Sequence, residues 1–318
     1  MAVAITNNTP SAAPQRIAYF TLRAAALLER MEQRALYPYQ ITQEAKGMLG
    51  SGEGWRAERF LSQAFQRSAD TTVGNMLISV IGKNGYHRED EGNGLKQAWD
   101  VFAIMRELGT ADSFTYNSMM HTYALVGKAD RARKVFDMAV EAGAEDLVSY
   151  KTVIDAYYRA RQFGKVLTFI REAPVEMKET EDLRLSEIEC LRKIRRYDEA
   201  LDRIQEVAQD PTFSGEALER ALVNGACCIK EMGDAEGAVS ELRRLLGAMD
   251  GNSKSRLRAM SLLVLWGGLE AHEAPEFRKE MVRIADVLNG NKGSVMEHYT
   301  RALEVIGGML AEGKEARA

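Results

Sequence analysis

Three cysteines and four histidines are the residues of this chain best suited to nucleophilic or metal chemistry, but their spacing supports neither. A zinc site needs Cys or His side chains at short, regular intervals, such as a CxxC pair. Cys227 and Cys228 are adjacent, Cys190 lies well upstream, and no CxxC occurs. The histidines are scattered: His87, His121, His272 and His298. We therefore expect the cysteines to be small, buried helix residues of a reducing compartment, with no metal and no internal disulfide.

The common catalytic and cofactor-binding signatures are missing as well. The sequence contains no GxxxxGK[ST], GxGxxG, GxSxG or HExxH segment. These patterns hold a nucleoside triphosphate, a dinucleotide, a catalytic serine and a zinc ion respectively. The sequence therefore predicts a binding protein that is not an enzyme, with no catalytic residue, no metal and no cofactor.

The charge of the chain limits which partners it can hold. Its net charge is −4 and no segment is strongly basic, which argues against tight, nonspecific binding to phosphate groups. No apolar run reaches the roughly 18 residues of a membrane-spanning helix, so we expect no membrane partner.

Residues 1–14 are small and polar, contain no acidic side chain, and predict a flexible tail. With Arg16 and Arg23 they also fit an organelle-import segment, and a tail that directs export of a secreted effector or adaptor is a further alternative. The compartment is therefore unknown, cytoplasmic or organellar (mitochondrion or plastid).

A repeat of 34 residues organises the middle of the chain. Small residues recur at that step, and a large apolar residue follows each of them four positions later. The small residues are Ala98, Ala132, Val166 and Ala200, and the large ones are Phe102, Phe136, Ile170 and Ile204. This spacing predicts one helix per repeat with a buried face on which the small residue permits close packing.

A second set of columns predicts another helix upstream of each of these. Its members are Ile78, Met120, Ile154 and Ile188, followed three residues later by Ile81, Tyr123, Tyr157 and Leu191. Turns separate the two helices at 83–85, 126–128 and 161–164, where glycine frees the backbone, and at 195–197. An insertion at 87–94 in the first repeat predicts an exposed loop.

A single helical hairpin cannot bury its apolar face, so successive hairpins must stack. The fold class is predicted to be all-α, a right-handed α-solenoid of stacked helix-turn-helix repeats with a concave ligand-binding surface. After the tail, residues 15–70 would form capping helices and a partial repeat, and 71–208 about four repeats. Residues 209–318 would form a further hairpin and a C-terminal helical cap.

Two segments resemble the opening of pentatricopeptide (PPR) repeats. They are Ser-Phe-Thr-Tyr-Asn-Ser-Met-Met at 113–120 and Leu-Val-Ser-Tyr-Lys-Thr-Val-Ile at 147–154. The resemblance covers residues 71–174 well and extends more weakly to 208. The remaining features of the repeat are shared with tetratricopeptide (TPR) repeats, which the C-terminal hairpins resemble.

The PPR resemblance implies binding of single-stranded RNA, one base per repeat. In that family the fifth residue of the first helix and the last residue of the repeat contact the base. Carried over, these positions give Asn75 with Asp112 and Asn117 with Asp146, a combination that favours a pyrimidine, uracil above all. By the same resemblance, Phe114 and Val148 would sandwich bases. These four polar and two apolar residues, together with Lys151 as a phosphate ligand, form the predicted RNA-binding site.

Several features leave the ligand open. Lys151 and Leu185 occupy the fifth position in later repeats and do not fit the family's base-contacting scheme. Asp112 and Asp146 also stand where an N-cap belongs, and capping alone would account for them. A TPR-like scaffold that binds a protein or peptide is therefore the alternative function.

Overall fold

The computed structural model describes residues 38–85, 91–249, 251–288 and 295–315. Within these residues the chain forms sixteen helices, α2 to α17, and no strand. The chain divides into two compact units, Met1–Gln162 (unit 1) and Phe163–Ala318 (unit 2). The expectation for the tail at 1–14 lies outside the described residues, as does much of the expected N-terminal cap.

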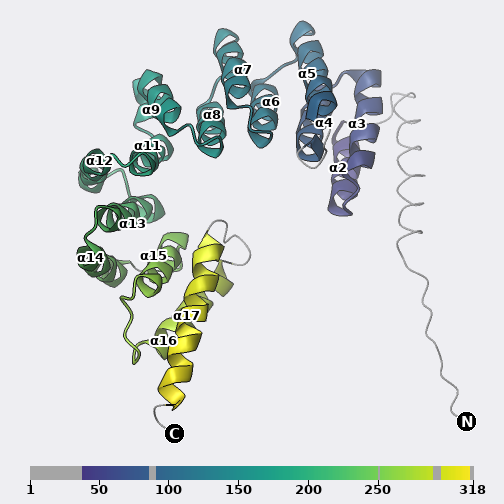
Figure 1. Ribbon diagram of the computed structural model, residues 1–318. Helices are drawn as coiled ribbons and strands as arrows, with labels where there is room; N and C mark the ends of the chain where they lie inside the picture. Colours follow the sequence, from purple (N-terminus) through teal and green to yellow (C-terminus); the bar gives the residue numbers. More distant parts are fainter. Residues whose placement is uncertain (1–37, 86–90, 250, 289–294, 316–318) are drawn as a thin grey trace, which may run out of the picture. The chain divides into compact units, whose positions relative to one another are not determined.

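Unit 1 consists of two layers of helices (Figure 1). One layer contains the first helices of the hairpins: α2 (Pro38–Gly50), α4 (Thr71–Gly85), α6 (Ser113–Leu125) and α8 (Leu147–Arg159). The other contains the second helices: α3 (Gly54–Ser68), α5 (Glu91–Glu107) and α7 (Ala129–Glu141). Consecutive first helices pack directly on one another, whereas each second helix packs mainly on first helices. The first helices therefore form the more tightly packed layer of unit 1.

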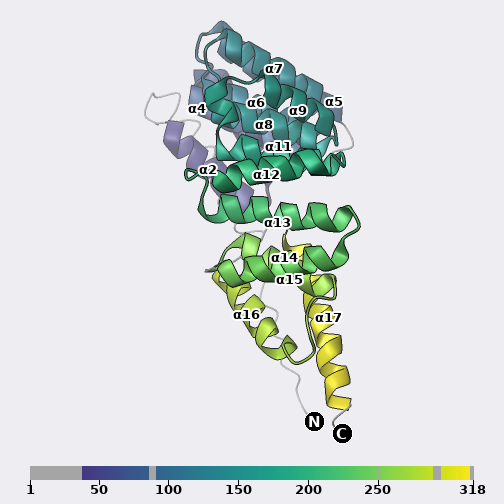
Figure 2. The ribbon, with the colours of Figure 1, turned by 90° about the vertical axis from the view of Figure 1, so that its left-hand side faces the viewer.

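Unit 2 also consists of helical hairpins, and it ends in two further helices (Figure 2). Its hairpin helices are α9 (Phe163–Glu172), α11 (Glu181–Lys193), α12 (Tyr197–Gln209), α13 (Gly215–Glu231), α14 (Ala235–Ala248) and α15 (Lys254–Leu265). The single turn α10 (Val175–Lys178) joins α9 to α11. The C-terminal helices α16 (Ala274–Val287) and α17 (Val295–Glu315) both pack on α15.

The repeat columns form the core of each unit. All four small residues from Ala98 to Ala200 are fully buried, and the apolar residues four positions later are at most 6% exposed. Phe102 and Phe136 each pack edge-on against a tyrosine of the following first helix, Tyr116 and Tyr150. The first-helix columns, including Tyr123 and Tyr157, are buried too. The predicted all-α solenoid of helix-turn-helix repeats is confirmed.

One residue in each turn adopts a left-handed conformation, and it too recurs every 34 residues. Gly127 (φ +70°), Arg161 (φ +57°) and Arg195 (φ +64°) take this position. The backbone N–H of the following residue returns to the carbonyl five positions earlier, as in the 2.9 Å bond from Gln162 to Tyr157. The expectation that glycine supplies the freedom at 161–164 is therefore wrong, because Gly164 lies inside α9 and Arg161 makes the turn.

The insertion in the first repeat is only partly a loop. Residues 86–90 lie outside the described part of the chain, but α5 begins at Glu91, so the last four inserted residues extend this helix. The expectation of an exposed loop through Gly94 is wrong for these residues. Gly92, Asn93 and Gly94 have the composition of a turn, but in the structure they lie in the first turn of α5.

Candidate nucleic-acid interface

Asp112 and Asp146 cap consecutive first helices in the same way. The carboxylate of Asp112 accepts a hydrogen bond of 2.8 Å from the backbone N–H of Thr115, and Asp146 accepts one of the same length from Ser149. The hydroxyl of each N3 residue accepts the N-cap N–H in return, which completes a capping box. The capping role considered from the sequence is therefore real.

The same two carboxylates also contact the asparagine of the preceding first helix. Asn75 Nδ2 lies 3.2 Å from Asp112 Oδ1, and Asn117 Nδ2 lies 3.1 Å from Asp146 Oδ1. Stacking of α4 on α6 and of α6 on α8 brings the members of each pair together across 37 and 29 residues of chain. The structure thus unites each predicted asparagine with its predicted aspartate, and we call these contacts the Asn75–Asp112 pair and the Asn117–Asp146 pair.

These contacts set the protonation of both carboxyl groups. Partial burial alone would raise the pKa of Asp112, but the hydrogen bonds from Thr115 and Asn75 outweigh it and lower the pKa below its ordinary 3.8. Burial would likewise raise the pKa of Asp146, but the hydrogen bonds from Ser149 and Asn117 outweigh it, so this pKa is also lowered. Both groups are carboxylates at neutral pH, so each can only accept hydrogen bonds.

Two apolar side chains extend into solvent beside these pairs. Phe114 is 60% exposed and Val148 is 54% exposed, each two residues after a capping aspartate. Lys151 is exposed on the first turns of α8. The first turns of α6 and α8 thus combine a capping carboxylate with exposed apolar surface, and the exposed ring of Phe114 is a surface on which a base can stack. We call the residues Asn75, Asp112, Phe114, Asn117, Asp146, Val148 and Lys151 the first-helix face of unit 1.

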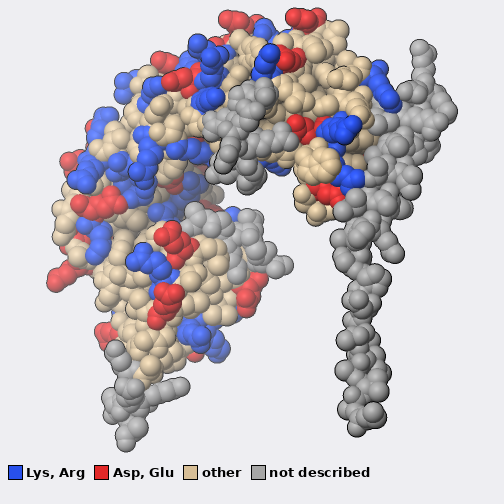
Figure 3. Space-filling model, turned by 45° about the vertical axis from the view of Figure 1, so that its right-hand side comes forward, with Lys and Arg blue, Asp and Glu red and all other residues tan. Residues whose placement is uncertain are grey.

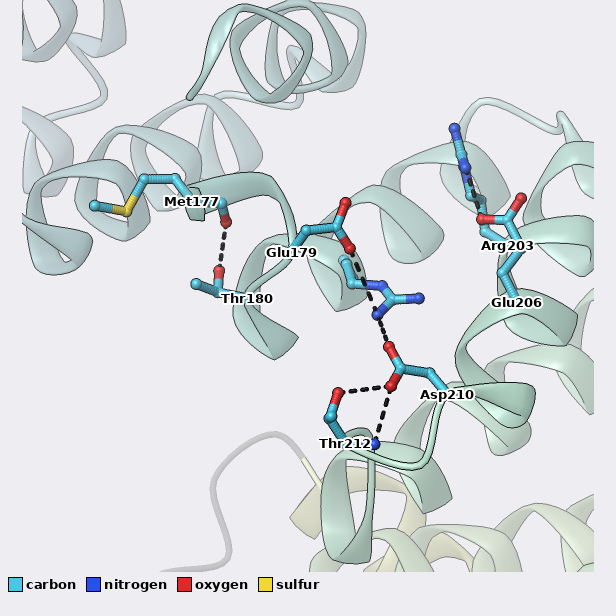
Figure 4. Close-up of polar contacts among 8 residues, drawn as sticks. Met177, Glu179, Thr180, Arg203, Glu206, Asp210 and Thr212 are labelled. Atoms are coloured by element: carbon cyan, nitrogen blue, oxygen red, sulfur yellow. Dashed lines mark hydrogen bonds and ion pairs between the residues drawn. The ribbon is translucent and has the colours of Figure 1, made fainter. Parts of the chain in front are cut away.

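In the described part of unit 2, the corresponding positions of the first repeats hold other groups. The Thr180 hydroxyl donates to the Met177 carbonyl at 2.7 Å (Figure 4), and Leu185 is 4% exposed in the core. One hairpin further on, Ser253 Oγ donates to Glu219. Glu219 is the fifth residue after the N-cap of α13, and Ser253 is the N-cap of α15, so this contact has the geometry of the unit 1 pairs without their amide.

Charged groups of unit 2 are largely paired with one another around α11 and α12 (Figure 4). Arg184 lies between Asp210, to which it is hydrogen-bonded, and Glu179 at 3.8 Å. Asp210 also accepts from the Thr212 hydroxyl and backbone N–H, and these bonds, with Arg184, lower its pKa to about 2. These arginine and acidic side chains neutralise each other, so this cluster adds no net basic surface.

The described part of the chain contains no candidate metal site and no reactive thiol. Among those residues no three His, Cys, Asp or Glu side chains are grouped to hold a metal ion, and no helix is long and apolar enough to span a membrane. All three cysteines are at most 5% exposed, as predicted, and their side chains are free thiols. Burial raises the pKa of Cys190 and of Cys228 to about 12, which suppresses the reactive thiolate.

The sequence analysis missed two residues that support the capping aspartates from below the surface, Thr115 and Ser149. Both are fully buried hydroxyl side chains at N3 of their helices, and each hydrogen-bonds a capping aspartate. The signal was present, since Asp-x-x-Thr and Asp-x-x-Ser match the spacing of a capping box.

Comparison with known proteins agrees with this geometry. The model of the PPR repeat matches residues 114–143 and 148–174, which include the N-terminal turns of α6 and α8. The chain is a PPR/TPR-like helical-repeat protein. A comparison with curated proteins gave no match. The matched repeats bear out the resemblance at 113–120 and 147–154.

Two solved structures show how far the fold of this PPR/TPR-like protein is shared. Yeast Tom70 superposes with a TM-score of 0.55 at 16% identity, over 96% of this chain and 62% of its own. The pentatricopeptide repeat protein PPR10, in complex with an 18-nucleotide psaJ RNA element, superposes with a TM-score of 0.50 at 18% identity, over 97% of this chain and 43% of its own. The chain thus spans less than two thirds of either relative. At these identities the likeness establishes the helical-repeat fold alone.

Proposed function

We propose that this protein binds single-stranded RNA through the first-helix face of unit 1, and that it prefers pyrimidines. The observation that carries the proposal is the coexistence of the Asn117–Asp146 pair with the exposed side chains of Phe114 and Val148. An amide and a carboxylate offer a donor and an acceptor to the edge of a base, while the apolar groups offer its faces a stacking surface. The RNA-bound state of PPR10, a protein of similar fold, supports the same ligand class.

The charge of the protein indicates that few phosphates take part. Figure 3 shows Lys and Arg side chains interspersed with Asp and Glu on the face in view, in keeping with a net charge of −4. Each neutralised phosphate contributes a slope of about −0.7 to the logarithmic salt dependence of binding to single strands. We expect a shallow salt dependence and modest affinity, dominated by stacking.

The proposal is tested by fluorescence anisotropy with labelled oligo(U), oligo(C) and oligo(A) at two salt concentrations. We expect both pyrimidine homopolymers to bind more tightly than oligo(A). Phe114→Ala should weaken binding to oligo(U) about tenfold, since stacking on one base contributes about 1–3 kcal/mol. Val148→Ala should weaken it less, because valine offers a smaller surface.

Val140 provides the matched control for Val148. It is 44% exposed but lies on α7, in the layer of second helices. Val140→Ala should leave the affinity unchanged. Equal, weak binding of all three homopolymers, unaffected by Phe114→Ala, would refute RNA recognition at this face.

The second candidate function is binding of a protein segment by the TPR-like hairpins of unit 2. Its support is the composition of the corresponding positions there, where Leu185 is buried and Glu219 would repel phosphate. A pulldown that retrieves a stoichiometric protein partner, combined with no RNA affinity, would favour this function over the first.

A further inference from the structure

The two amide–carboxylate pairs of unit 1 differ in what satisfies the asparagine oxygen. Asn117 Oδ1 accepts a hydrogen bond of 2.7 Å from Ser149 Oγ. Asn75 Oδ1 is buried and has no hydrogen-bond partner among the described residues, and Asn75 as a whole is only 5% exposed. The corresponding hydroxyl, Thr115 Oγ1, donates to Asp112 at 2.7 Å instead. Two pairs with the same backbone register therefore present different groups to a ligand.

Ser149 fixes which way the Asn117 amide points. Its single hydroxyl proton lies within reach of two acceptors, Asn117 Oδ1 at 2.7 Å and Asp146 Oδ1 at 3.0 Å. Donation to the amide oxygen leaves Nδ2 facing the Asp146 carboxylate. A flipped amide would set its oxygen against that carboxylate, where two acceptors repel each other. The second N–H of Asn117 is thereby held in one direction.

The contact between repeats does not by itself require base recognition. In unit 2, Glu219 and Ser253 make it without an amide. At the corresponding position of α11, Leu185 is buried and its side chain has no polar group. The fifth residue of a first helix can therefore link that helix to the N-cap of the next first helix without any role in base recognition. The Asn75–Asp112 pair, with its buried asparagine, fits that linking role, whereas Asn117 is only partly buried and can reach a ligand.

We propose that Ser149 is a positioning residue for base recognition: it orients Asn117 so that the Asn117–Asp146 pair distinguishes bases, while the Asn75–Asp112 pair mainly joins neighbouring repeats. This inference rests on the proposed RNA-binding function. Ser149 is fully buried and cannot touch the ligand itself. It acts through the direction of one amide N–H.

The test compares Ser149→Ala with Thr115→Ala in the full-length chain. Both variants remove a buried N3 hydroxyl from a capping box, but only the first removes a bond to an asparagine. The readout is the ratio of the affinities for oligo(U) and oligo(A). Ser149→Ala should reduce this ratio about fivefold, the effect of one hydrogen bond. Thr115→Ala should leave it unchanged.

The inference would be overturned if Ser149→Ala left the ratio of affinities unchanged and lowered thermal stability by the same amount as Thr115→Ala. Ser149 would then act only in helix capping. A second readout is independent of RNA: the side-chain amide signals of Asn117 in ¹⁵N NMR spectra of the free protein. They should shift and exchange faster in Ser149→Ala, and unchanged signals would also overturn the positioning role. If no RNA binds but these signals move, the proposed function and its base-recognition step fail while the orientation of Asn117 stands.

Discussion

The side-chain amide of Asn117 donates a hydrogen bond of 3.1 Å to the carboxylate of Asp146, which lies 29 residues further along the chain. Asp146 is also the N-cap of α8, so one carboxylate both begins a helix and joins it to the preceding repeat. Local capping and repeat stacking are thereby coupled through a single side chain.

This coupling is measurable in a double-mutant cycle. Asp146→Ala should lower the free energy of unfolding by about 1–2 kcal/mol, because the cap and the inter-repeat bond are both lost. Asn117→Ala should cost about 1 kcal/mol, and the double variant should show a coupling of at least about 0.5 kcal/mol in urea unfolding. Strictly additive effects would mean that the two side chains do not stabilise each other.

The turns between helices predict a stabilising substitution. Arg161 and Arg195 hold the left-handed conformation that Gly127 holds in the second repeat, which is unfavourable for a side chain with a Cβ. Arg161→Gly or Arg195→Gly should raise the free energy of unfolding by about 0.5–1 kcal/mol, after the entropy cost of glycine is subtracted. Gly127→Ala should lower it, and thermal unfolding of the three variants provides the measurement. Destabilisation by both Arg→Gly changes would refute the argument.

Much of the fold could be predicted because the apolar columns repeat with fixed spacing, and each column is buried. The start of α5, the turn α10 and the left-handed Arg161 could not, since they depend on backbone choices that the columns do not specify. In the site, the resemblance singled out Asn117 and Asp146, but their direct contact follows from how closely α6 and α8 stack. The burial of Asn75 depends on the helices packed around it, and no pattern in the nearby sequence predicts it.

Because α4 packs closely on α6, replacing Gly82 by a larger residue should lower the stability of the protein. A Cβ at this position would lie 2.6 Å from Thr122 Oγ1, whose hydroxyl is itself buried and within 3.2 Å of the Ile78 carbonyl. Gly82→Ala should lower stability by about 1–3 kcal/mol through overpacking, in spite of alanine's better helix propensity. Gly164→Ala, at a helical glycine with open space around it, should instead be neutral or stabilising in the same denaturant titration. A stabilising Gly82→Ala would show that α4 and α6 lie further apart.

Acid should weaken unit 2 through Asp210. Its pKa is lowered to about 2 in the folded protein from an ordinary 3.8, by Thr212 first and by Arg184. The stability it contributes is therefore fully present above about pH 4 and is lost as the pH falls through 2. Asp210→Asn should lower stability at pH 6 and flatten the pH dependence between 4 and 2, as followed by urea unfolding. Asp202→Asn, an exposed change on α12, is the control, and identical acid profiles for the two variants would contradict the assignment.

The most direct measurement is ultraviolet crosslinking of the full-length chain to a 4-thiouridine-labelled oligo(U), with the adducts located by mass spectrometry of tryptic peptides. Binding at the first-helix face of unit 1 predicts adducts in peptides 107–128 and 135–151, which carry Phe114 and Val148, and their loss from the first peptide in Phe114→Ala. Adducts confined to peptides of unit 2 or of the second helices, or none at all at saturating RNA, would contradict the proposed interface.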